Sequence, residues 1–118
     1  MVGYMTSNGI VVRQGDSFDI LLHLRDSRSK DVDLSGCVLR MTVKDQKENK
    51  VMFTVEGEIL DAGKGKAVIA LTPKNTDIEV GDYVCDIELK FANGAVHTIY
   101  PQQVGKVGVF KITEQVTR

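Results

Sequence analysis

The two histidines, His23 and His97, are the side chains best suited to proton transfer near neutral pH. Each lies in a run of alternating apolar residues, which predicts a β-strand. No third metal ligand and no nucleophile stands at a spacing that would complete a metal centre or a catalytic triad with either one. We therefore expect both histidines to be exposed strand residues.

Two short segments imitate ion-binding loops. Asp31-Val32-Asp33-Leu34-Ser35-Gly36 has oxygens at alternate positions and glycine at the sixth, as in a calcium loop, but Thr42 occupies the twelfth position, where a glutamate is needed. Gly63-Lys64-Gly65-Lys66 resembles part of a phosphate loop, but Leu60 and Ala67 replace the glycine and the serine or threonine that it requires. We interpret both segments as turns.

Three acidic residues alternate along one predicted strand: Asp82, Asp86 and Glu88. A pair of carboxylates can perform acid–base catalysis when an apolar environment raises the pKa of one of them. We see no apolar residue around these three that would raise a pKa, and predict a solvated face. We expect this face to pair across the sheet with Arg40 and Lys44, so that their strand is its neighbour.

The cysteines and one tyrosine are assigned to structure. Cys37 and Cys85 fall in predicted strands, and we favour two buried free thiols over a disulfide. Tyr83 precedes Cys85 by two residues near the start of its strand, which is typical of a tyrosine corner, where the hydroxyl bonds to a nearby backbone group. The sequence thus predicts no catalytic, cofactor-binding or metal-binding residue, and no enzyme.

The element that organises these residues is a hairpin over Gly81 to Tyr100. Its two alternating runs are joined by Asn93-Gly94, which predicts a type I′ turn. Ser17 to Arg25 is a second strongly alternating strand. Pro73 after Thr72 indicates one capped helical turn. The other predicted strands are Ile10 to Arg13, Cys37 to Lys44, Val51 to Val55, Glu58 to Leu60, Lys66 to Thr72 and Lys106 to Thr113.

Seven to nine short strands separated by regular turns predict an all-β fold, an immunoglobulin-like antiparallel β-sandwich. A small closed barrel is the alternative. The polar segment from Asp26 to Gly36 suits a crossover between sheets, and Gly57 a bulge or bend. We divide the chain into a flexible N-terminal arm, residues 1–9, and one sandwich domain, residues 10–118.

Composition argues against two classes of partner. With 118 residues, 15 Lys and Arg and 16 Asp and Glu, the net charge is −1, which gives no field to attract nucleic acid. No apolar run approaches the roughly 18 residues that span a bilayer, and the start lacks a signal peptide, so we expect no membrane insertion and synthesis in the cytoplasm.

An ordered series of turn and strand motifs resembles the immunoglobulin-like domain of bacteriophage virion proteins, and is similar to the N-terminal domain of phage baseplate upper proteins. The motifs are Gly15-Asp16-Ser17, Asp33-Leu34-Ser35-Gly36-Cys37, Leu71-Thr72-Pro73-x-Asn75-Thr76, Gly81-x-Tyr83-x-x-Asp86-Ile87-Glu88 and Asn93-Gly94-x-Val96-x-Thr98-Ile99. The resemblance implies a non-catalytic role in tail or baseplate assembly or decoration, with other tail or baseplate proteins as partners. It places the chain in the virion, and in the host cytoplasm before assembly.

Contacts with partners are expected at strand edges, where backbone N–H and C=O groups are unpaired. The predicted edges are Ile10 to Arg13, Val51 to Val55 and Lys106 to Thr113. We therefore expect a homo-oligomer. A carbohydrate- or peptide-binding module on the same sandwich is the alternative function.

Overall fold

The computed structural model describes residues 3–102 and 105–114. This part of the chain has strands as its main secondary structure and almost no helix, in agreement with the predicted all-β class. The strands are β1 (Tyr4–Met5), β2 (Gly9–Arg13), β3 (Phe18–His23), β4 (Val38–Asp45), β5 (Lys50–Glu56), β6 (Glu58–Asp61), β7 (Lys66–Leu71), β8 (Gly81–Lys90), β9 (Val96–Tyr100) and β10 (Gly108–Thr113). A 3₁₀ turn, η1 (Ala62–Lys64), and one helical turn, α1 (Pro73–Thr76), complete the set.

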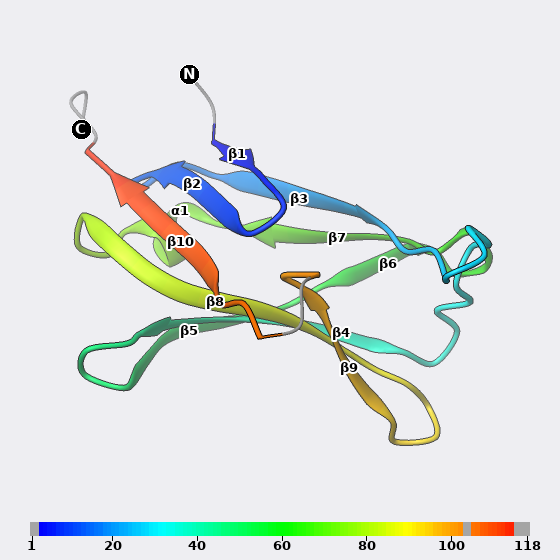
Figure 1. Cartoon of the computed structure of the whole chain (residues 1–118). Helices are drawn as coiled ribbons and strands as arrows, with labels where there is room; N and C mark the ends of the chain where they lie inside the picture. Colours follow the sequence, from blue (N-terminus) through cyan, green and yellow to red (C-terminus); the bar gives the residue numbers. More distant parts are fainter. Residues whose placement is uncertain (1–2, 103–104, 115–118) are drawn as a thin grey trace.

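The strands form two sheets that face each other. The larger has seven strands in the order β1-β2-β10-β8-β4-β5, with β9 also paired to β8, and the smaller has the order β3-β7-β6. Figure 1 shows β3, β7 and β6 in the upper layer and β8, β4 and β5 in the lower one. The side chains between the layers form one core, so the arrangement is sandwich-like.

One pairing departs from the predicted antiparallel sandwich, because β2 and β10 run parallel. Parallel neighbours need a long connection between them. Here almost the whole domain provides that connection, since β2 lies near the start of the chain and β10 near its end. Local alternation cannot reveal such a pairing, and the prediction of a wholly antiparallel fold was wrong.

The predicted central hairpin is present as β8 and β9. Its turn differs from the type I′ turn that we expected, because Gly94 has a φ of 91° while Asn93 does not have a positive φ. The Gly94 N–H donates to the Phe91 carbonyl at 2.9 Å, and the Phe91 N–H donates to the Ala95 carbonyl at 2.8 Å. This is the longer hairpin loop that closes with glycine in the left-handed region.

β4 lies beside β8, as predicted. Alternation holds on both strands: Leu39, Met41 and Val43 from β4 are buried, and so are Ile87 and Leu89 from β8. These side chains pack between the layers because successive strand residues point to opposite faces of a sheet. The polar segment between β3 and β4 crosses from the smaller sheet to the larger one, which confirms the predicted crossover.

Gly57 lies where the chain passes from β5 in the larger sheet to β6 in the smaller one. Its N–H donates to the Leu39 carbonyl at 2.7 Å. A Cβ at this position would stand 2.7 Å from Leu39 Cδ2, so no larger residue fits without movement. The bend predicted at Gly57 is thus a change of sheet.

Of the three edge strands that we predicted, one is an edge of the larger sheet and two are not. β5 is an edge strand, as expected. β2 and β10 are interior strands, because each pairs on both sides. Tyr4 and Met5, which we assigned to a flexible arm, form β1 beside β2, and Met5 packs against the core. Met1 and Val2 lie outside the described residues.

Within the described residues, no helix has both the length and the apolar character required to cross a membrane.

Candidate functional site

The candidate site is an open groove of about 440 Å³ between β9 and the end of β3, which we name the β9 groove. Its polar lining residues are His23, Arg25, His97, Thr98 and Gln102. Its apolar lining residues are Leu24, Val32, Leu89, Phe91 and Ile99. The volume lies within the usual range for ligand sites, roughly 300–1,000 Å³.

One wall of the groove is fixed by a local turn after β3. Asp26 accepts hydrogen bonds from the N–H groups of Arg28 at 2.8 Å and Lys30 at 3.0 Å, so the chain reverses here. The reversal pairs Arg25 with Asp31 in an isolated antiparallel bridge. Asp31 Oδ1 then lies 2.8 Å from His23 Nε2 and 3.7 Å from Arg25 Nε. One carboxylate thus holds two basic side chains at the groove.

The opposite wall comes from the central hairpin. His97 projects from β9 and meets the ring of Phe91 edge to face, with 5.5 Å between the ring centroids. Both histidines are exposed strand residues, as predicted. Their approach to the same groove was not predicted, because the two strands are far apart in the sequence and belong to different sheets.

The paired side chains of His23 and Asp31 lie at the surface of the groove. They are 36% and 38% exposed, and the groove is open to water. Among the described residues, no three His, Cys, Asp or Glu side chains gather in a way that could hold a metal ion.

The two loop-like motifs form turns, as interpreted from the sequence. Asp33 Oδ1 accepts from the Ser35 N–H at 3.0 Å and from its hydroxyl at 2.7 Å, and these two bonds lower the pKa of Asp33. In the lysine-rich segment, Asp61 Oδ1 caps η1 by accepting from the Lys64 N–H at 3.3 Å. Gly65 ends η1 with a φ of 66°.

The acidic face of β8 requires a correction. Burial raises the pKa of Asp86, and the nearby Glu88 carboxylate raises it further, whereas we expected no group here to be desolvated. The reason is tertiary, because β8 pairs with β4 along one side and with β10 and β9 along the other. A carboxylate in the middle of a wide sheet loses more water than one on an isolated strand.

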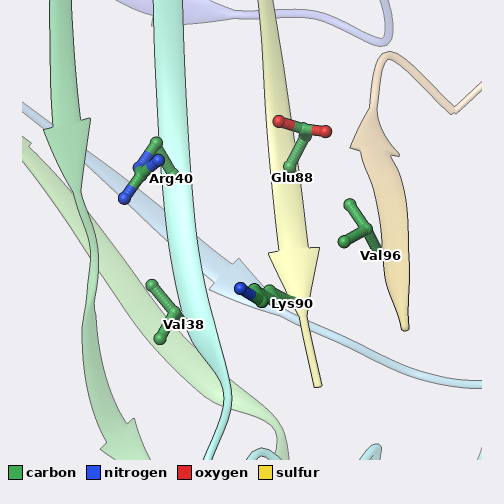
Figure 2. Close-up of a pocket in the computed structure, with 5 residues that line it drawn as sticks. All are labelled: Val38, Arg40, Glu88, Lys90 and Val96. Atoms are coloured by element: carbon green, nitrogen blue, oxygen red, sulfur yellow. The ribbon is translucent and has the colours of Figure 1, made fainter. Parts of the chain in front are cut away.

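The prediction of cross-strand ion pairs was wrong, because in the described part of the chain neither Arg40 nor Lys44 pairs with an acidic residue of β8. Arg40 lies opposite Glu88 in β8, but its 3.2 Å ion pair is with Glu56 in β5. Figure 2 shows Arg40 turned away from Glu88, which lies on the neighbouring strand. With Val38, Lys90 and Val96, these two residues line a shallow depression of about 220 Å³ on the outer face of the larger sheet.

The cysteine prediction is confirmed for one residue and wrong in part for the other. Both thiols are free. Cys85 is buried in β8, and burial raises its pKa to about 12. Cys37 is only half-buried and precedes β4, because the turn from Asp33 carries it to the end of the sandwich.

Tyr83 forms the hydrogen bond predicted for a tyrosine corner. Its ring is buried, and its hydroxyl donates to the Glu79 carbonyl oxygen at 2.6 Å. The bond ties the loop before β8 to the core side of that strand. This is a structural role, separate from the β9 groove.

Comparison with known proteins adds no assignment, since no protein-family model matches the sequence and no curated protein matches it significantly. The function must therefore be inferred from the residues and their arrangement.

Proposed function

We propose that this chain is a non-catalytic structural protein of a tailed bacteriophage or prophage, an immunoglobulin-like domain that assembles or decorates the tail or baseplate through protein–protein contacts. It resides in the virion, and in the host cytoplasm before assembly. Its partners are other tail or baseplate proteins and further copies of itself. The turn and strand motifs that resemble phage virion domains support this assignment.

The sheet topology supports the immunoglobulin-like part of the proposal. In an immunoglobulin variable domain, one sheet carries strands G, F, C and C′, and the other carries B, E and D. The order β10-β8-β4-β5 opposite β3-β7-β6 follows that layout. If β8 is assigned as strand F, the bond from the Tyr83 hydroxyl to the Glu79 carbonyl corresponds to a tyrosine corner, which supports the assignment.

The single observation that carries the interaction role is the presence of open strand edges in the larger sheet, one of which, β9, lies beside an open groove. In the described part of the chain, β5 pairs only with β4, and β9 pairs only with β8. Edge strands offer unpaired backbone groups to a partner. A domain with such edges is suited to assembly.

The test is to locate the chain in purified virions of the phage, or induced prophage, that encodes it. We expect immunogold particles at the tail or baseplate, and loss of that labelling in a phage deleted for the gene. Antibody against a capsid protein serves as the positive control for particle integrity. Virions that contain all other tail proteins but not this chain would contradict the proposal.

A peptide- or carbohydrate-binding module is the second candidate, and the β9 groove favours it. Polar side chains at its rim and apolar ones at its floor could hold either ligand. A glycan array distinguishes the two, because a carbohydrate module would give saturable signals that disappear when Phe91 is replaced by Ala.

A further inference from the structure

We propose that the β9 groove binds an extended peptide segment of a partner protein, one that carries carboxylates between apolar side chains and adds as a strand to the free edge of β9. This inference rests on the proposed role in protein–protein contacts and specifies the chemistry of one partner.

The shape of the groove indicates strand addition. His97, Thr98 and Ile99 are consecutive residues of β9, and all three line the groove. His97 lies opposite Leu89 and Thr98 lies opposite Glu88, so these two successive side chains point to opposite faces of the sheet. Ile99 is the extra residue of a bulge. A groove lined by both His97 and Thr98 runs along the edge of the strand, where its backbone is accessible. β8 is the only strand that pairs with β9 in the described part of the chain. Alternate residues of β9 therefore direct their N–H and C=O groups away from β8, toward the groove.

The charges at the groove indicate the ligand's polar groups. The described lining residues include Arg25, His23 and His97 and no acidic side chain, although the chain as a whole has a net charge of −1. Asp31 is not a lining residue, and its Oδ1 lies 3.7 Å from Arg25 Nε. A guanidinium has five N–H donors, so the donors on its terminal nitrogens remain available for a ligand carboxylate.

The floor of the groove indicates the ligand's apolar groups. Val32, Phe91 and Ile99 are only partly buried and pack against the core from the groove side. An added strand would place alternate side chains on this floor and direct the others to the polar rim. A sequence that alternates apolar and acidic residues meets both requirements.

The probe is a capped, fluorescein-labelled heptapeptide of alternating leucine and glutamate, titrated with the full chain in a fluorescence anisotropy experiment. We expect saturable binding, with NMR chemical-shift changes concentrated in β9 and the segment after β3. The same peptide with glutamine for glutamate is expected to bind about tenfold more weakly, the usual scale for loss of a charge-assisted hydrogen bond. Two N-methylated forms of the glutamate peptide test the contribution of backbone hydrogen bonds. In one form the methyl groups replace the amide hydrogens along one edge of the extended peptide, and in the other form along the opposite edge. One of the two is expected to lose binding.

The protein variant is Arg25→Gln, which is expected to weaken the glutamate peptide about tenfold and to leave the glutamine peptide unchanged. Arg28→Gln is the matched control. It removes the same charge from the same exposed segment, outside the groove. Far-UV circular dichroism establishes that both variants are folded before binding is compared.

Any of three results with the glutamate peptide would overturn the inference: no saturable binding at millimolar concentration, equal losses for Arg25→Gln and Arg28→Gln, or shifts confined to another surface. Hexanoate is the last ligand to be tested, in the same titration. If it binds as tightly as the peptide, the site recognises a small carboxylate with an apolar tail, and the strand-addition model is wrong. None of these results bears on whether virions contain the chain, so the two proposals can fail separately.

Discussion

Two tyrosine hydroxyls, from β8 and β9, anchor neighbouring loops to the larger sheet through hydrogen bonds. The Tyr83 hydroxyl donates to the Glu79 carbonyl at 2.6 Å. The Tyr100 hydroxyl donates to the Thr6 carbonyl at 2.9 Å and so anchors the segment between β1 and β2. Both rings are buried, and buried polar groups are costly when they lose their partners.

Replacement of Tyr83 by Phe is therefore expected to destabilise the domain. The change keeps the ring but leaves the Glu79 carbonyl without its partner, which costs about 1–3 kcal/mol in the free energy of unfolding. Tyr4→Phe is the control, because Tyr4 is 50% exposed and the change should stay within about 0.5 kcal/mol. Urea unfolding followed by far-UV circular dichroism measures both, since the chain has no tryptophan for fluorescence. Equal stability of the Tyr83 variant and the parent would contradict the assigned role.

Alkaline pH should destabilise the fold through Cys85 and Tyr100. Burial raises the pKa of Cys85 from 9.0 to about 12, and burial with the nearby Cys85 raises the pKa of Tyr100 from 10.0 to about 12. The folded state therefore retains protons that the unfolded state has lost, and stability falls as pH rises from about 9 through 12. The slope is at most about 1.4 kcal/mol per pH unit for each group.

Urea midpoints between about pH 8 and about pH 11.5 measure this dependence. Cys85→Ala should start from a lower stability, because it removes a buried side chain. Its stability should nevertheless fall less steeply than that of the parent between about pH 9 and 10, because the larger of the two cysteine pKa shifts is gone, while the more exposed Cys37, whose pKa burial also raises, remains. A parent protein as stable at about pH 11 as at about pH 8 would refute the expectation.

At the scale of elements, the turn between η1 and β7 positions β7 beside β3. Gly65 ends η1 in the left-handed region, and its N–H donates to the Ala62 carbonyl at 3.2 Å. The Gly65 carbonyl accepts from the Leu24 N–H at 2.8 Å. This glycine therefore brings the start of β7 against the chain that continues from β3, at one wall of the β9 groove.

Gly65→Ala is expected to destabilise the domain more than Gly94→Ala. Both positions have positive φ, which costs a residue with a Cβ about 1–2 kcal/mol. At Gly94 a Cβ would meet nothing within 4 Å, whereas at Gly65 it would stand 2.4 Å from the Leu24 carbonyl oxygen. The clash should add at least roughly 1–3 kcal/mol, as overpacking does. Thermal and urea unfolding of the two variants isolate this difference, and equal losses would contradict it.

For the molecule as a whole, the proposed homo-oligomer predicts a mass above that of one chain. Sedimentation equilibrium should give a multiple of 13.0 kDa that rises with concentration. A proline placed at the exposed residue Thr54 in the edge strand β5 should lower the association, because it removes a backbone donor. The Gly57 N–H donates to the Leu39 carbonyl, and the bonds of an antiparallel ladder alternate along the strand. The N–H of Thr54, opposite Thr42, is therefore directed away from β4 and is available to a partner. Proline at the tip residue Asn93 is the control for an unrelated loop. A mass of 13.0 kDa at every concentration tested would exclude self-association.

Alternation in the sequence was enough to predict most strands and the residues that they bury. Ile20 in β3 is buried, and so is every second residue from Tyr83 to Leu89 in β8, as a period of two requires. Local chemistry likewise predicted α1, where Thr72 accepts from the Asn75 N–H at 3.3 Å and Asn75 accepts in return at 2.9 Å. These features depend only on neighbours in the chain, so the sequence contains them.

The tertiary structure alone decided which strands are edges and which side chains share a groove. Because β10 pairs with β2, two strands that we predicted as edges are interior strands. Asp86 is partly desolvated because β8 has neighbouring strands on both sides. His23 and His97 meet the same groove because a sheet change between β3 and β4 brings the end of β3 toward the central hairpin. Pairing of distant strands depends on the packing of the whole core, and the pattern within any one strand is compatible with several partners.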